Sequence, residues 1–92
     1  MCRNIRVLHH FEPPTTKEEI RDAALQFVRK VSGLNKPSHA DEGSFTRAID
    51  EIARSTGELL ASLHSRGEPR TREREREKAR ARWKAREAQL AR

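Results

Sequence analysis

The stretch that decides the fold is residues 15–33, TTKEEIRDAALQFVRKVSG. Thr16 followed by Glu19 forms a capping box, in which a hydroxyl and a carboxylate each accept a hydrogen bond from a backbone N–H left free at a helix start. Apolar residues then recur at spacings of three and four, which is typical of one helix face. Gly33 stands where helices commonly end in a left-handed residue. These signals predict a helix over about residues 17–32.

A second amphipathic helix is expected over about residues 39–65. Ser38 offers an N-cap, and Gly67 and Pro69 follow the expected end. Gly57, inside this helix, is typical of close packing. The short loop before Ser38 makes the two helices antiparallel neighbours. The residues expected to form a core or a self-association face are Ile20, Phe27, Val31, Phe45, Ile49, Ile52, Leu59 and Leu63.

Residues 1–14 are expected to form an extended arm, because Pro13 and Pro14 disfavour helix in the residues before them. In an extended arm, the adjacent side chains of His9 and His10 would point to opposite sides. Two helices cannot enclose a core by themselves. The arm must therefore cover one side of the pair, and the tail or a second copy must cover another.

The positive charge of this 92-residue chain is concentrated at one end. The net charge is +6, and residues 1–69 hold equal numbers of basic and acidic side chains, so residues 70–92 carry the whole excess. This tail is rich in Arg, Glu and Ala, which favour helix, but it places like charges four residues apart. We expect a marginal helix that frays towards its end.

These elements predict an all-α fold: an extended N-terminal arm packed on an antiparallel helix pair, plus a basic C-terminal helix. Residues 1–69 would form one small domain and residues 70–92 a basic helix or tail. No apolar run approaches the roughly 20 residues of a membrane span. The single cysteine excludes an internal disulfide, and no apolar run of signal-peptide length begins the chain. A cytoplasmic protein that does not bind membranes is therefore expected.

Several motifs resemble one family of short bacterial proteins. They are Met1-Cys2-Arg3-Asn4-Ile5, Phe11-Glu12-Pro13-Pro14, Glu19-Ile20-Arg21, residues 23–33 and Lys36-Pro37-Ser38. The family is known only as the domain of unknown function DUF2277. The resemblance covers most of residues 1–65, and the tail is also similar. It implies a bacterial, mostly helical protein and implies no activity.

Cys2 is the candidate reactive thiol. Removal of the initiator methionine would leave its thiol beside a free α-amine, and Arg3 would favour the thiolate. The alternative is a small apolar anchor on the arm. The four histidines follow no recognised metal-ligand spacing. No phosphate loop, catalytic triad or carboxylate pair is present, so we predict no catalytic residues, metal or cofactor and lean against an enzyme.

The tail carries the candidate contacts to nucleic acid or another polyanion. Arginine makes bidentate contacts with phosphate, and a tryptophan can stack on a base. The interleaved glutamates would oppose a polyanion, so a solvated tail and a docking helix remain alternatives. The candidates are Arg72, Arg74, Arg76, Lys78, Arg80, Arg82, Trp83, Lys84 and Arg86.

The sequence favours a non-enzymatic interaction module that binds a protein partner or a second copy of itself. One alternative is a nucleic-acid-associated accessory protein that acts through residues 70–92. Another is a thiol-based sensor or catalyst that uses Cys2. No small-molecule substrate is inferred.

Overall fold

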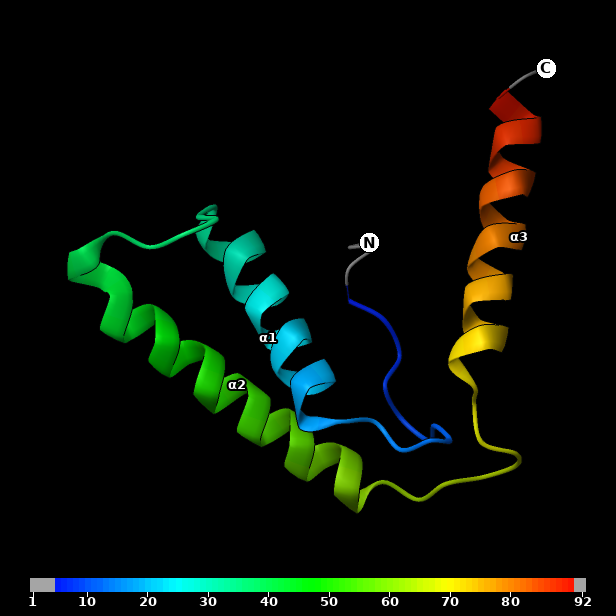
Figure 1. Cartoon of the computed structure of the whole chain (residues 1–92), viewed down its shortest axis with the longest axis horizontal. Coiled ribbons are helices and arrows are strands. Elements are labelled where there is room, and N and C mark those ends of the chain that lie inside the picture. The colour runs from blue at the N-terminus through cyan, green and yellow to red at the C-terminus, as the bar shows by residue number, and fades with distance from the viewer. Residues whose placement is uncertain (1–4, 91–92) are drawn as a thin grey trace.

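The computed structural model describes residues 5–90 and is helical in that part. Its elements are α1 (Lys17–Ser32), a short 3₁₀ turn η1 (His39–Asp41), α2 (Glu42–Ser62) and α3 (Arg72–Leu90). Figure 1 shows α1 and α2 side by side and antiparallel, with the arm running next to α1 and α3 standing apart. The all-α prediction is confirmed.

The capping box fixes the start of α1. The Thr16 N–H donates to Glu19 Oε1 at 2.9 Å, and the Glu19 N–H donates to Thr16 Oγ1 at 3.1 Å. At the other end Gly33 is left-handed, with φ 72°, and its N–H donates to the Arg29 carbonyl. Both ends of α1 lie where the sequence placed them.

The second helix begins later and ends earlier than expected. The Ser38 hydroxyl donates to the Asp41 carboxylate at 3.1 Å and makes no capping bond to the backbone, so η1 precedes the α-helix. At the C-terminal end the Ser62 hydroxyl donates to the Leu59 carbonyl, a local bond that competes with helix continuation. Leu63 is extended and ends α2.

Gly57 is not required for close packing, which corrects the sequence prediction. A Cβ built on Gly57 would meet the Ile20 Cδ1 atom at 4.0 Å, an ordinary van der Waals contact. The two helix backbones therefore leave room for a methyl group at this position.

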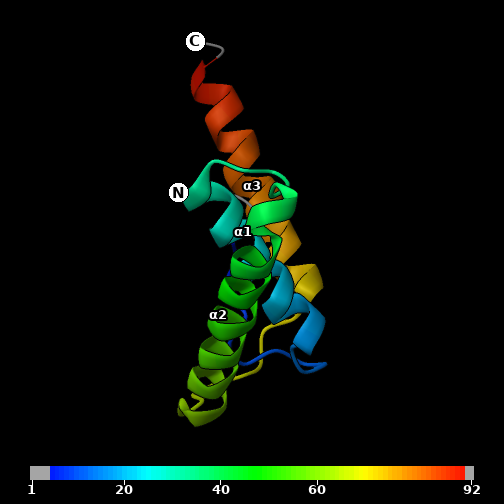
Figure 2. The same ribbon diagram turned by 90° about the vertical axis from the view of Figure 1, so that its left-hand side faces the viewer.

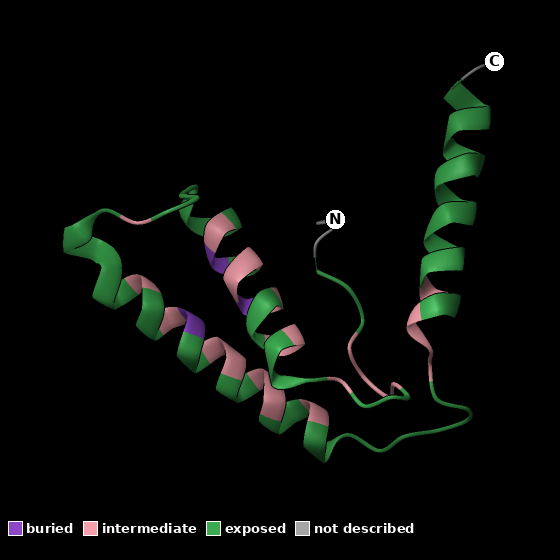
Figure 3. Ribbon diagram, viewed as in Figure 1, coloured by how far each residue is buried: buried purple, intermediate pink, exposed green. Residues whose placement is uncertain are grey.

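The core is small and lies between α1 and α2. Among residues 5–90 the buried side chains are Ala24, Val28 and Ile49, flanked by partly buried neighbours such as Phe45 and Ile52. Figure 3 shows these buried positions confined to the facing sides of the two helices. A single neighbouring helix covers only part of an apolar stripe that is 100° wide or more. Four expected core residues therefore remain exposed: Phe27, Val31, Leu59 and Leu63.

Within the described part of the chain, the backbone of the third helix packs against neither α1 nor α2, although the side chain of its first residue, Arg72, donates to Glu19 of α1. Figure 2 shows it projecting away from the helix pair. It is continuous over Arg72–Leu90, and every residue from 76 to 90 is exposed. The radius of gyration is 16.2 Å, where a compact chain of this length would have about 12 Å. Within residues 5–90, no helix is both long and apolar enough to cross a membrane.

Candidate functional site

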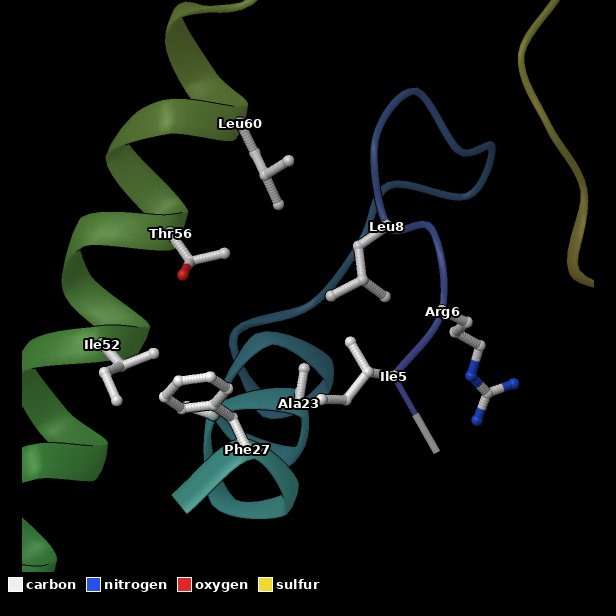
Figure 4. A pocket seen from close by; sticks show the side chains of 9 residues that line it. Ile5, Arg6, Leu8, Ala23, Phe27, Ile52, Thr56 and Leu60 are labelled. Atoms are coloured by element: carbon white, nitrogen blue, oxygen red, sulfur yellow. The ribbon is translucent and has the colours of Figure 1, made fainter. Parts of the chain in front are cut away.

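An open apolar groove runs between the arm and the helix pair. Its cavity volume is about 260 Å³. Figure 4 shows Ile5 and Leu8 of the arm on one side, Ile52, Thr56 and Leu60 of α2 on the other, and α1 below. The lining residues are Ile5, Arg6, Leu8, Ala23, Ala24, Phe27, Ile52, Thr56 and Leu60. The arm therefore covers the helix pair incompletely.

The apolar surface extends from the groove along both helices. Phe27 lines the groove and is 45% exposed, and Val31, one turn further along α1, is 67% exposed. Leu59 is also exposed and lies on the same face of α2 as Ile52, and Leu63, directly after α2, is exposed as well. Exposed apolar side chains that adjoin an apolar groove are typical of interaction sites.

A second cavity of about 390 Å³ lies where the arm turns. His9 and His10 line it, together with Leu60 and Ala61 of α2. The expectation that the two histidines point apart is wrong, because His10 has φ 61° and the arm is not extended there. Their ring centroids lie 6.0 Å apart, and His10 Nε2 lies 3.1 Å from the Gly67 carbonyl oxygen.

The arm is joined to the segment that precedes α3. Phe11 and Arg70 form a parallel β-bridge, in which the Arg70 N–H donates to the His10 carbonyl at 2.7 Å and the Glu12 N–H donates to the Arg70 carbonyl at 2.9 Å. The Arg70 guanidinium also donates to the His9 carbonyl at 2.7 Å. The peptide bond between Glu12 and Pro13 within this turn is cis. We call this region, residues 9–14 with residues 67–72, the arm–tail junction.

Arg72 completes the arm–tail junction through side-chain contacts. Its Nη2 donates to Glu19 Oε1 at 2.7 Å and its Nε to Glu19 Oε2 at 3.1 Å, which is a bidentate pair. It also donates to the carbonyls of Pro13 and Pro14 and lies over the Phe11 ring, 5.3 Å from the centroid.

Glu19 is the most strongly perturbed titratable group among the described residues. The hydrogen bond from Arg72, followed by the one from the Thr16 backbone, lowers the pKa of Glu19 from 4.5 to about 2. The same pair raises the pKa of Arg72. Glu19 thus serves both the capping box of α1 and the attachment of α3.

The candidate polyanion contacts on α3 differ in how close they lie to an acidic side chain. Arg72 is held in the arm–tail junction, while Arg74 lies 3.8 Å from Glu68 and Lys78 lies 3.5 Å from Glu75. Arg82 and Arg86 are exposed and have no acidic residue three or four positions away. The remaining candidates, Arg76, Arg80, Trp83 and Lys84, are exposed on α3.

The thiol candidates Cys2 and Arg3 lie outside the described residues. Within residues 5–90, no three His, Asp or Glu side chains come together as a set that could hold a metal ion. The side chains that line the apolar groove are mostly aliphatic or aromatic, so it can bind a partner through apolar packing.

Sequence reasoning missed the arm–tail junction. The sequence pattern predicts a capping role for Glu19 and a polyanion contact for Arg72, whereas in the structure the two side chains are paired across 53 positions. No local pattern marks such a pair. The turn sequence Phe11-Glu12-Pro13-Pro14 indicated only that this segment is not helical, because proline has no backbone N–H to donate.

Comparison with known proteins identifies the family. The sequence model of DUF2277, described as an uncharacterized conserved protein, matches residues 1–78. The chain belongs to this family. No curated protein and no solved structure matched it. The family match includes the arm, both helices of the pair, the arm–tail junction and the first turns of α3, and it ends before Arg82 and Arg86.

Proposed function

We propose that this DUF2277 protein is a non-enzymatic interaction module that binds another protein chain through the apolar groove and the exposed edge of α1. The observation that carries this proposal is the uncovered apolar face. Phe27 and Val31 belong to the same helix as the buried Ala24 and Val28, yet Phe27 is only partly covered and Val31 is mostly exposed. An exposed face of this kind is stabilised when a partner removes it from water.

Affinity purification from the source cells tests the proposal. The full chain is compared with Val31→Asp, which places a charge on the exposed edge of α1. Leu90→Asp is the matched control, because Leu90 is also exposed but lies at the far end of α3. A protein that co-purifies with the full chain and with Leu90→Asp, but not with Val31→Asp, is then identified by mass spectrometry. Binding of that protein in purified form supports the proposal.

The proposal fails if purified Val31→Asp keeps every interaction of the full chain. It also fails if the full chain binds no protein, including itself. Circular dichroism of each variant separates loss of binding from loss of helix.

A second candidate function is binding of nucleic acid by α3. The observation that favours it is the pair Arg82 and Arg86, exposed one turn apart and without acidic neighbours at helical spacing. Each phosphate neutralised on duplex DNA steepens the dependence of log K on log salt by about 0.9. The residues beyond the family match would then carry the phosphate contacts.

Fluorescence anisotropy with mixed-sequence DNA and RNA tests this candidate. We expect the double variant Arg82→Ala with Arg86→Ala to weaken binding and to reduce the salt slope by about 2. The control is Arg47→Ala with Arg54→Ala, which removes the same charge from exposed positions of α2. Equal effects of the two double variants, or no binding at low salt, would exclude a specific role for α3.

A further inference from the structure

The folded chain exposes far more surface than a compact monomer of its mass. Its accessible surface is 7,891 Å², where a compact protein of 10.6 kDa exposes about 5,500 Å². A standard protein interface covers about 800 Å² on each partner. The excess is about three times that area. Part of this excess surface area belongs to the projecting α3. One third of the excess area, if it lies on the helix pair, is enough for a standard interface.

The surface that holds the apolar groove also carries an exposed apolar side chain that could fill a groove of the same kind. An apolar cavity of about 150 Å³ in a protein core is large enough to bind benzene. The groove, with a volume of about 260 Å³, can therefore receive a phenyl ring or a branched aliphatic side chain. Val31 projects from the same face of α1 as Phe27, one turn away, and supplies such a side chain. A surface that carries both parts can pair with itself about a two-fold axis.

The charge distribution also suits self-pairing of the helix pair. Residues 1–69 have equal numbers of basic and acidic side chains, so two copies of this region meet without net repulsion. The helix α3 is a poor occupant of the groove, because its large apolar side chains are only Trp83 and Leu90 and it carries excess positive charge. Among the helices described for this chain, α1 and α2 are the amphipathic ones, so a second copy would cover the groove with these two helices.

We infer that a second copy of this chain covers the groove, with Val31 and Phe27 of each copy packed at the mouth of the other copy's groove. The two helix pairs then form a four-helix arrangement, as in antiparallel bundles. This inference rests on the proposed function and names the partner. The arm keeps its place as one wall of each groove, and both copies of α3 remain outside the interface.

Sedimentation equilibrium of the full chain tests the inference, with a photo-crosslinking benzoylphenylalanine at position 31 as a second measurement. We expect a dimer, and we expect the crosslink to join position 31 of one chain to Ile52, Thr56 or Leu60 of the other. Val31→Asp should raise the dimer Kd by about thirtyfold or more, because it places an unpaired charge in a central contact. Leu90→Asp should leave the Kd unchanged.

Three results would overturn the inference. One is a monomer at concentrations up to about 1 mM. Another is a dimer whose Kd is the same in Val31→Asp, and the third is a crosslink that maps only to α3 of the second copy. A monomer that nevertheless binds a different protein through Val31 would refute the second copy and leave the proposed function standing. A monomer that binds no protein would refute both.

Discussion

The pair formed by Glu19 and Arg72 should make the stability of the fold depend on pH in the acid range. The folded pKa of Glu19 is about 2 and its ordinary value is 4.5. A carboxyl group whose pKa is lowered by folding contributes stability above its unfolded pKa and loses that contribution as the pH falls towards its folded pKa. The contribution is therefore complete at neutral pH and is lost between about pH 4.5 and pH 2.

The size of this contribution follows from the exposure of the pair. One pKa unit corresponds to about 1.4 kcal/mol, so the full shift would give about 3.4 kcal/mol for a group shielded from water. The Glu19 side chain is 34% exposed, and exposed ion pairs contribute about 0–1 kcal/mol because water screens them. The pair is bidentate, which favours the upper end, and we expect Glu19→Gln to cost about 1 kcal/mol at pH 7.

Glu19→Gln is the informative substitution because glutamine keeps the capping hydrogen bond and removes the negative charge. The glutamine side chain can still accept the hydrogen bond from the Thr16 backbone, so the capping box survives. Only the charge that faces Arg72 is lost. Thermal unfolding followed by circular dichroism should show a lower Tm than the parent at pH 7 and a smaller difference as the pH approaches 2.

Arg72→Leu supplies the control for this prediction. Added to Glu19→Gln, it should lower the Tm by less than it does in the parent chain, because the two residues share one interaction. If the two losses are strictly additive, or if Glu19→Gln lowers the Tm equally at pH 7 and at pH 2, the pair is not formed as described.

Four further substitutions test the packing and the capping of the helix pair, each followed by thermal unfolding. Gly57→Ala should stabilise by about 1 kcal/mol from helix propensity, since its methyl group meets Ile20 at an ordinary contact distance. Gly43→Ala, which meets nothing within 4 Å, should give a smaller gain, because Gly43 lies in the first turn of α2. A loss of stability at Gly57 alone would show closer packing than described. Ala24→Leu should destabilise by about 1–3 kcal/mol, because Ala24 is 2% exposed and the added atoms would overpack the contact with α2; an unchanged Tm would contradict its burial. Thr16→Ala should cost about 1 kcal/mol by removing the N-cap hydroxyl, and no loss would show that the capping box does not anchor α1.

Structural features that depend on residues close together in the chain could be predicted from the sequence. Thr16, Glu19 and Gly33 determine the two ends of α1 through hydrogen bonds that span three or four positions, so those ends could be located from the printed residues alone. The start of α2 was harder, because Ser38 had two partners within reach. Its hydroxyl bonds the Asp41 side chain, and a pattern of residue types does not distinguish that bond from a backbone cap.

Burial and the arm–tail junction depend on residues far apart in the chain and could not be predicted. The periodicity of α1 placed Phe27 and Val31 in its apolar stripe, but the position of α2 decides that Ala24 and Val28 are buried instead. Similarly, the approach of Arg70 to His10 and of Arg72 to Glu19 follows from the path of residues 63–71 back to the arm. The groove exists for the same reason, since it lies where the arm, α1 and α2 meet.

The bridge between Phe11 and Arg70 has a mechanical consequence. The two segments run parallel, so a force that pulls the arm and α3 apart along the chain direction slides one segment past the other. Under such a load, the hydrogen bonds from Arg70 to His10 and from Glu12 to Arg70 are stretched together rather than one after the other. The helix pair lies between these two residues in the chain, and tension applied through the two ends reaches it only after the bridge has opened.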